Sequence, residues 1–247
     1  MELFGYSERG VINSLFYSIS HCSNSGDLLT DFLSRVAFPS VDVALQVMGA
    51  TVLIDQSFSD FGSADVVLLL ETQGAQKAVF VEAKVKTAQR PYWRVFDEFE
   101  ALEKGIQKGK IAASNLFIQL YYKVRLTTAL ESGGLTKLQR GVAFPKCCGK
   151  AKTVFRTIGT NPVVLGAVRR LEQYCQDALF VALLPEEEGN LKTFYEDKLR
   201  GYRPPSFQEW ETSNWGYLTW RQVEHFCRAH NLQQTLQVLE FNAGQIY

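Results

Sequence analysis

The sequence lacks a long uninterrupted hydrophobic run. None of its segments approaches the roughly 18 consecutive apolar residues that a membrane-spanning helix requires. The most apolar candidate, residues 41–54, is interrupted by Asp42 and Gln46. The first residues, Met-Glu-Leu-Phe-Gly, contain no charged leader followed by an apolar core, so they do not resemble a signal peptide. We therefore expect neither a membrane span nor a membrane partner.

Cysteine is scarce and irregularly spaced. The chain has 5 cysteines, an odd number, and their positions form no regular disulfide framework. Reduced thiols are typical of the cytoplasm, so the sequence predicts a cytoplasmic protein. A zinc site needs paired Cys or His motifs, and Cys227-Arg-Ala-His230 is one half of such a motif without a second half. We therefore expect no zinc site.

Net charge is absent as well, because 26 basic residues balance 26 acidic ones. A neutral total argues against a strongly basic nucleic-acid binder. The charges are nevertheless unevenly distributed. Residues 104–171 contain 13 Lys and Arg and a single acid, Glu131, whereas the segments before and after are net acidic. This asymmetry indicates a polyanionic partner for the basic part of the chain.

The composition is that of a folded protein, with 46% apolar and 13% aromatic residues. Helical spacing of apolar residues predicts helices from Glu8 onwards with Ser7 as the cap, and at 27–37, 91–111, 115–131, 161–176 and 219–229. Pro91 is expected in the first turn of its helix, and Gly133-Gly134 is expected to end the helix that begins near Asn115. That helix has a strand as its alternative, because Phe117-Ile-Gln-Leu-Tyr-Tyr122 is rich in β-formers.

Strands are expected at 50–54, 64–70, 78–86 and 178–184. The second and third are joined by a short link containing Gly74, which predicts a β-hairpin. The run Val66-Val-Leu-Leu-Leu70 is apolar on both faces, as in a strand covered by helices. Residues 133–160 have no clear periodicity, and we expect a basic loop or insertion there. Together these elements predict one α/β domain over residues 1–247, with a mixed central β-sheet flanked by helices.

Three charged residues on the predicted hairpin carry the chemical argument. In a strand, Glu82 and Lys84 point to one face, while their apolar neighbours point to the other. Asp65 opens the preceding strand, so its carboxylate comes close to Glu82 and the two repel each other. A hard divalent cation such as Mg²⁺, or Mn²⁺, resolves this repulsion and activates a water against a phosphodiester. Lys84 is then placed to orient that water or to neutralise developing charge.

Each of these assignments has an alternative. The Glu-x-Lys string can also be a buried ion pair in a structural sheet. Glu8 falls on the apolar face of the first helix, which indicates a partner such as a metal, although an acid in a first turn is favoured by the helix dipole in any case. Asp55 and Asp60 are rival acids that we expect in loops.

Asp65, followed after a turn by Glu82-Ala83-Lys84 in an α-β-β-β-α-β order, resembles the PD-(D/E)XK, or restriction-endonuclease-like, nucleases. The resemblance covers about residues 1–130, and Ala64 stands where the family motif has proline. It implies an αβββαβ core and Mg²⁺-dependent phosphodiester cleavage, with metal on Asp65 and Glu82. It also implies that Lys84 assists the attacking water and that Glu8 faces the site.

A nucleic-acid surface is predicted from the basic segment. Gln119 and Lys123 share a helix face, and neither they nor Tyr122 complete the Gln-x-x-x-Tyr motif that some RecB-like members carry. The further predicted nucleic-acid contacts are basic residues, namely Lys137, Arg140, Lys146, Lys150, Lys152 and Arg156, joined by Arg169 and Arg170. The aromatic residues of the same region are candidates for base stacking, namely Tyr121, Tyr122, Phe144 and Phe155. An ordinary solvated surface and core packing are the respective alternatives.

The sequence thus predicts a metal-dependent nuclease acting on DNA in preference to RNA. An RNA-directed nuclease of the same fold is the first alternative. A catalytically silent member that binds nucleic acid or a protein in a defence or repair assembly is the second. Cleavage of both strands would require two active sites, so a homodimer stays open.

Overall fold

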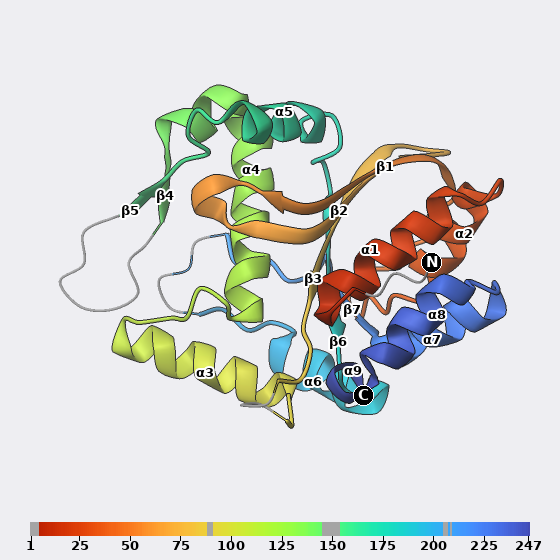
Figure 1. The fold of residues 1–247 in the computed structure, drawn as a ribbon. Coiled ribbons are helices and arrows are strands. Elements are labelled where there is room, and N and C mark those ends of the chain that lie inside the picture. The colour runs from red at the N-terminus through yellow and green to blue at the C-terminus, as the bar shows by residue number, and fades with distance from the viewer. Residues whose placement is uncertain (1–4, 88–90, 145–153, 205–206, 208) are drawn as a thin grey trace.

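The computed structural model describes all residues except 1–4, 88–90, 145–153, 205–206 and 208. Its centre is a mixed five-stranded sheet in the order β1-β2-β3-β6-β7 (Figure 1). The first three strands pair antiparallel and the last three run parallel. The sheet strands are β1 (Val47–Ser57), β2 (Ser63–Thr72), β3 (Gln76–Ala83), β6 (Leu179–Leu184) and β7 (Trp215–Thr219).

Helices cover both faces of this sheet. One face packs against α1 (Ser7–Ser20), α2 (Ser25–Ser34), α7 (Trp220–Ala229), α8 (Gln233–Phe241) and α9 (Ala243–Ile246). The other face packs against α3 (Val95–Lys108), α4 (Leu116–Arg140), α5 (Pro162–Leu171), α6 (Glu188–Phe194) and the short helical segment η2 (Tyr195–Leu199). This confirms an α/β protein with a mixed central sheet flanked by helices.

The β2–β3 hairpin forms as predicted, with Val66 opposite Val81 and Leu69 opposite Ala78. Residues 66–70 of β2 are buried, because helices lie on both sides of the sheet. Alternate residues of β3 enter opposite cores: Phe80 packs toward α4, and Val79 and Val81 pack toward α1 and α2. The predicted alternation of the strand is confirmed.

Several helices begin where a side chain caps the backbone. Asn115 accepts hydrogen bonds from the backbone of Phe117 and Ile118 at the start of α4, so the strand alternative for this segment is wrong. Asn161 caps α5 in the same way. Thr219 and Gln222 form a capping box at the start of α7.

Other expected boundaries are wrong. Ser7 does not cap α1, because the N-cap position is Tyr6 and no side-chain capping bond forms. Pro91 lies outside α3, which begins only at Val95. Helix α4 does not end at the glycine pair: Gly134 adopts a left-handed φ of 61°, and the chain kinks and continues to Arg140.

The expected basic loop at 133–160 therefore contains regular structure. After the end of α4, β4 (Val142–Phe144) and β5 (Val154–Arg156) pair antiparallel as a second, two-stranded sheet. Helices α8 and α9 are not predicted from the sequence either. In the described part of the chain, no helix is both long and apolar enough to cross a lipid bilayer.

Candidate functional site

The candidate site lies where β2 begins and β3 ends, at one end of these two interior strands. Because the strands are antiparallel and Val66 pairs with Val81, the next step along the ladder brings Asp65 opposite Glu82. The backbone amide of Ala83 donates a hydrogen bond of 2.7 Å to Asp65 Oδ2. This bond fixes the Asp65 carboxylate beside the end of β3. The apposition of the two carboxylates expected from the hairpin is present.

Glu82 is completely buried and faces a buried cation. Lys123 Nζ, from α4, lies 3.1 Å from Glu82 Oε1, and both side chains are fully shielded from solvent. The same ammonium donates hydrogen bonds to the carbonyl oxygens of Phe61 (3.2 Å) and Ser63 (2.8 Å). Its approach to Glu82 is that of an ion pair, and among the described residues no hydrogen bond of regular geometry reaches either carboxylate oxygen of Glu82.

The two carboxyl groups hold protons more tightly than free acids do. Burial raises the pKa of Glu82 to about 7, and Asp65 acts in the same direction, while Lys123 and Lys84 oppose the shift. Burial also raises the pKa of Asp65, and the charge of Glu8 adds to that effect. A fully buried carboxylate beside a partly buried one that repels it is the electrostatic arrangement that a divalent cation relieves.

Lys84 lies directly after β3 and is held from three sides. Its backbone amide donates to the carbonyl of Leu183 (2.9 Å), and its carbonyl accepts a hydrogen bond from Trp220 Nε1 (2.8 Å). Its ammonium donates to the side-chain oxygen of Gln119 in the first turns of α4. Gln119 and Lys123, four residues apart, therefore face Lys84 and Glu82 from the same side of the helix.

Glu8 is half-buried in the first turn of α1 and lies close enough to raise the pKa of Asp65. Its neighbour Arg9 forms an ion pair of 3.2 Å with Asp55. Asp55 lies within β1, so the expectation of a loop position is wrong for this residue. Asp60 lies in the short turn η1 (Ser59–Phe61), and its carboxylate accepts a hydrogen bond from the backbone of Thr157.

The predicted nucleic-acid residues divide into internal and exposed groups. Lys123 is buried against Glu82, and Arg156 stacks on Tyr122 and donates to its hydroxyl (2.7 Å). Tyr121 and Phe144 are core residues, which removes them from the base-stacking candidates, whereas Phe155 is exposed. The exposed basic residues lie in the last turns of two helices, namely Lys137 and Arg140 in α4 and Arg169 and Arg170 in α5. Lys146, Lys150 and Lys152 lie outside the described residues.

Two contributions to the site are not predicted from the sequence. Trp220 is not among the site residues predicted from the sequence, yet its indole donates a hydrogen bond to the backbone carbonyl of Lys84. The second is the ion pair of Lys123 with Glu82. The helical spacing shows only that Lys123 lies on the same helix face as Gln119, and no local pattern identifies Glu82 as its partner.

The carboxylate oxygens of Asp65 and Glu82 suit an ion such as Mg²⁺, which needs few protein ligands. Within the described part of the chain, the buried oxygens of Glu82 accept no hydrogen bond of regular geometry, and Asp65 accepts one on Oδ2. No group of three or more His, Cys, Asp or Glu side chains is arranged for metal binding within the described residues. Mg²⁺ is commonly bound by one or two carboxylates while substrate phosphates and waters complete its shell, so the pair fits such an ion.

Comparison of the chain with protein-family models, with curated proteins and with solved structures finds no match.

Proposed function

We propose that the protein is a metal-dependent nuclease that hydrolyses phosphodiester bonds in DNA. The observation that carries this proposal is the meeting of Asp65 and Glu82 from adjacent strands, with the Lys84 ammonium beside them. The order of two helices, three antiparallel strands, three further helices with the small β4–β5 sheet between them, and a parallel strand supports a restriction-endonuclease-like αβββαβ core.

Asp65 and Glu82 are the proposed ligands of Mg²⁺ or Mn²⁺. An ion bound there polarises the phosphate and makes a bound water more acidic. Lys84 is held by Gln119 on the same side as Glu82, where its ammonium orients a water or offsets negative charge at the phosphate. Glu8 faces Asp65 from α1 and adds negative charge to the site.

The exposed cations of α4 and α5 are the proposed contacts to the DNA backbone. Helix α4 connects them to the site, because its first turns hold Gln119 and its last turn holds Arg140. DNA is proposed ahead of RNA, and matched DNA and RNA substrates in one assay separate the two.

One observation favours a second candidate, a catalytically silent nucleic-acid-binding protein. The ammonium of Lys123 already neutralises Glu82 inside the fold, which is the arrangement of a structural ion pair. Such a protein would bind DNA with strong salt dependence and show no turnover with any divalent cation.

The deciding experiment compares the wild-type chain with Asp65→Asn, Glu82→Gln and Lys84→Met on plasmid and oligonucleotide DNA in Mg²⁺ and Mn²⁺. We expect each variant to lose at least about 100-fold in cleavage rate while keeping its circular dichroism spectrum. Gln119→Ala should lose about tenfold, because Lys84 then loses its positioning partner. Asp55→Asn, an exposed acid paired with Arg9, is the matched control and should cleave normally.

Calorimetric titration with Mn²⁺ completes the test. The wild-type chain should bind the ion, and Glu82→Gln should abolish binding. A wild-type chain that binds no Mn²⁺, together with cleavage that Glu82→Gln leaves unchanged, rejects the nuclease proposal.

A further inference from the structure

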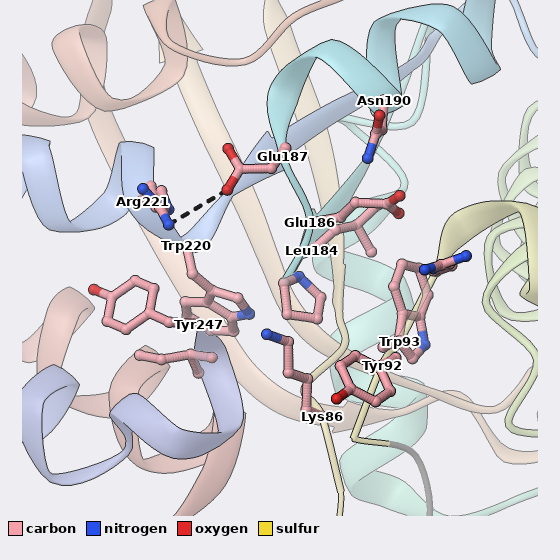
Figure 2. A pocket seen from close by; sticks show the side chains of 13 residues that line it. Lys86, Tyr92, Trp93, Leu184, Glu186, Glu187, Asn190, Trp220, Arg221 and Tyr247 are labelled. Atoms are coloured by element: carbon pink, nitrogen blue, oxygen red, sulfur yellow. Dashed lines mark ion pairs between the residues drawn. The ribbon is translucent and has the colours of Figure 1, made fainter.

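A hollow of about 220 Å³ lies beyond the C-terminal ends of the parallel strands. The chain leaving β3 contributes Lys86 and Tyr92 to its wall, the chain leaving β6 contributes Glu186 and Glu187, and the start of α7 contributes Trp220 and Arg221 (Figure 2). In open α/β sheets, the crevice outside the carboxyl ends of the strands is the usual place for ligands. The hollow is therefore a candidate binding site in its own right.

The hollow adjoins the candidate nuclease site without sharing its charged residues. Trp220 belongs to its wall and donates the hydrogen bond that holds the carbonyl of Lys84. Lys86 follows Lys84 by two residues, which is about 7 Å of extended chain. A polymer whose phosphate lies at Lys84 therefore reaches Lys86 with its next unit.

Aromatic side chains line the hollow on both sides of Lys86 (Figure 2). Tyr92 is 79% exposed, although a tyrosine ring normally gains free energy by burial. Figure 2 shows Lys86 between Tyr92 and Tyr247, with Trp220 close by. An exposed ring at the entrance of a hollow with an indole wall is a stacking platform for a flat ligand.

The charges of the hollow select an anionic ligand. Glu187 Oε1 is paired with Arg221 Nη2 at 3.3 Å, and Glu186 Oε2 accepts a hydrogen bond of 2.8 Å from the backbone of Val95. Both acids are thus engaged at the walls. The Lys86 ammonium has no hydrogen-bond or ion-pair partner among the described residues. It is therefore available to a phosphate.

We propose that this hollow binds an unpaired nucleotide of the DNA strand, next to the phosphate that is cleaved, with the base stacked on Tyr92 and its phosphate on Lys86. The inference rests on the proposed nuclease function and narrows its substrate to single-stranded DNA or a frayed end. A base paired inside a duplex keeps its faces stacked on its neighbours and does not reach a hollow of this size.

A second hollow, of about 350 Å³, continues on the other side of the same segment. The two hollows share Tyr92, Trp93 and Arg94. The segment therefore lines both hollows, and its exposed ring is that of Tyr92. This arrangement suits successive unpaired bases of one strand, because stacking on an aromatic ring tolerates every base.

Binding in the absence of divalent cations tests the proposal independently of catalysis. The probe is fluorescein-labelled dT10, measured by fluorescence anisotropy in EDTA with the full chain carrying Glu82→Gln. We expect Tyr92→Ala to weaken binding of dT10 about tenfold and Tyr92→Phe to leave it unchanged, because the stacking ring is kept. Lys86→Ala should weaken it about fivefold and lower the salt slope by about 0.7, the value for one phosphate on a single strand.

Matched controls lie on other surfaces. Tyr17→Ala removes an exposed tyrosine from α1, and Lys108→Ala removes an exposed lysine from the end of α3. Both should bind dT10 like the parent. A blunt duplex of the same length should show no effect of Tyr92→Ala.

The proposal is overturned if Tyr92→Ala and Lys86→Ala bind dT10 as tightly as the parent chain. It is equally overturned if the duplex loses as much affinity as dT10. Failure of the nuclease proposal alone gives a different result. In that case Tyr92→Ala still weakens dT10 binding, but the wild-type chain cleaves no DNA in Mg²⁺ or Mn²⁺.

Discussion

Glu82 and Lys123 form the pair of residues on which the chemistry and the stability of the site both depend. A carboxylate and an ammonium that are fully buried must satisfy each other, because neither reaches water. Lys123 retains two carbonyl acceptors, whereas Glu82 accepts no hydrogen bond from any described residue. The two partners are therefore unequal: the ammonium tolerates loss of the pair better than the carboxylate does.

A double-mutant cycle over this pair measures its strength. At pH 8, above the raised pKa of Glu82, Lys123→Met should lower the free energy of unfolding by about 3 kcal/mol, because it leaves a buried carboxylate without its cation. Glu82→Gln should cost less. The double variant should cost less than the sum, with a coupling of about 1 to 3 kcal/mol in urea denaturation. Additive single effects would show that the two side chains do not form a pair in solution.

Among the elements, α4 is the one that assembles the site, because it carries both Gln119 and Lys123. Its start is defined by Asn115, whose side-chain oxygen accepts from the backbone of Phe117 (3.1 Å) and whose Nδ2 donates to the carbonyl of Glu98 (2.8 Å). Asn115 therefore both caps α4 and bonds it to α3, which holds the first turns of α4, and with them Gln119, in place.

Asn115→Ala should therefore affect stability and activity together. Loss of a helix cap costs about 1 kcal/mol, and removal of the hydrogen bond to Glu98 adds about as much. Frayed first turns release Gln119 from Lys84, so the cleavage rate should fall several-fold. Asn161→Ala removes an equivalent cap from α5, which contributes no residue to the catalytic group of Asp65, Glu82, Lys84 and Gln119, and activity is compared at saturating DNA. It should cost about 1 kcal/mol in urea denaturation and leave the cleavage rate unchanged; equal losses of activity would contradict the role given to α4.

A contact between α2 and the end of α7 makes the stability of the fold depend on pH. Asp31 in α2 lies 2.7 Å from His230 Nε2 at the end of α7 and 2.9 Å from Arg35 Nη2. Burial alone raises the pKa of Asp31, but these two partners outweigh it and lower the pKa below its usual 3.8. The folded state thus favours the ionised form, and this contribution to stability is present above about pH 3.8 and lost as the pH falls further.

Asp31→Asn tests this interaction between α2 and α7. The wild-type chain should exceed the variant in free energy of unfolding by less than about 1 kcal/mol at pH 6, since the carboxylate is partly solvated. The difference should disappear near pH 3. Urea denaturation at pH 6, 4.5 and 3 measures it, and a difference that persists at pH 3 would assign the effect to packing.

The elements also show which features are visible in a sequence. The β2–β3 hairpin and the meeting of Asp65 with Glu82 depend on a period of two and a short turn, and both are local signals. The pairing of Glu82 with Lys123 depends on how α4 packs across the sheet, and no local pattern encodes it. The three-residue strands β4 and β5 are too short to show periodicity, and the kink at Gly134 is indistinguishable from a helix end.

At the scale of the whole molecule, the basic segment of the sequence places its exposed cations together on one side of the sheet. The basic segment includes α4 and α5, which lie on the same face of the sheet, and the end of α5 approaches the kink of α4 through Glu172. From Gln119 to Gly133, the last residue before the kink, α4 rises about 21 Å. The exposed cations thus lie far along the helix from the acidic pair, at a separation that a DNA segment of several base pairs spans.

Replacement of Lys137, Arg140, Arg169 and Arg170 by alanine tests whether these cations hold DNA. Duplex affinity should fall at least tenfold, and the slope of log affinity against log salt should fall by about 0.9 for each phosphate that the variant no longer binds. Cleavage at saturating DNA should be unchanged, because Asp65 and Glu82 are untouched. The alternative is that these cations only complement the helix C-termini, which predicts lower stability and unchanged DNA affinity. The charge-matched control replaces the exposed Lys192, Lys198, Arg200 and Arg203. If the control weakens DNA binding as much, non-specific charge and not this surface carries the affinity.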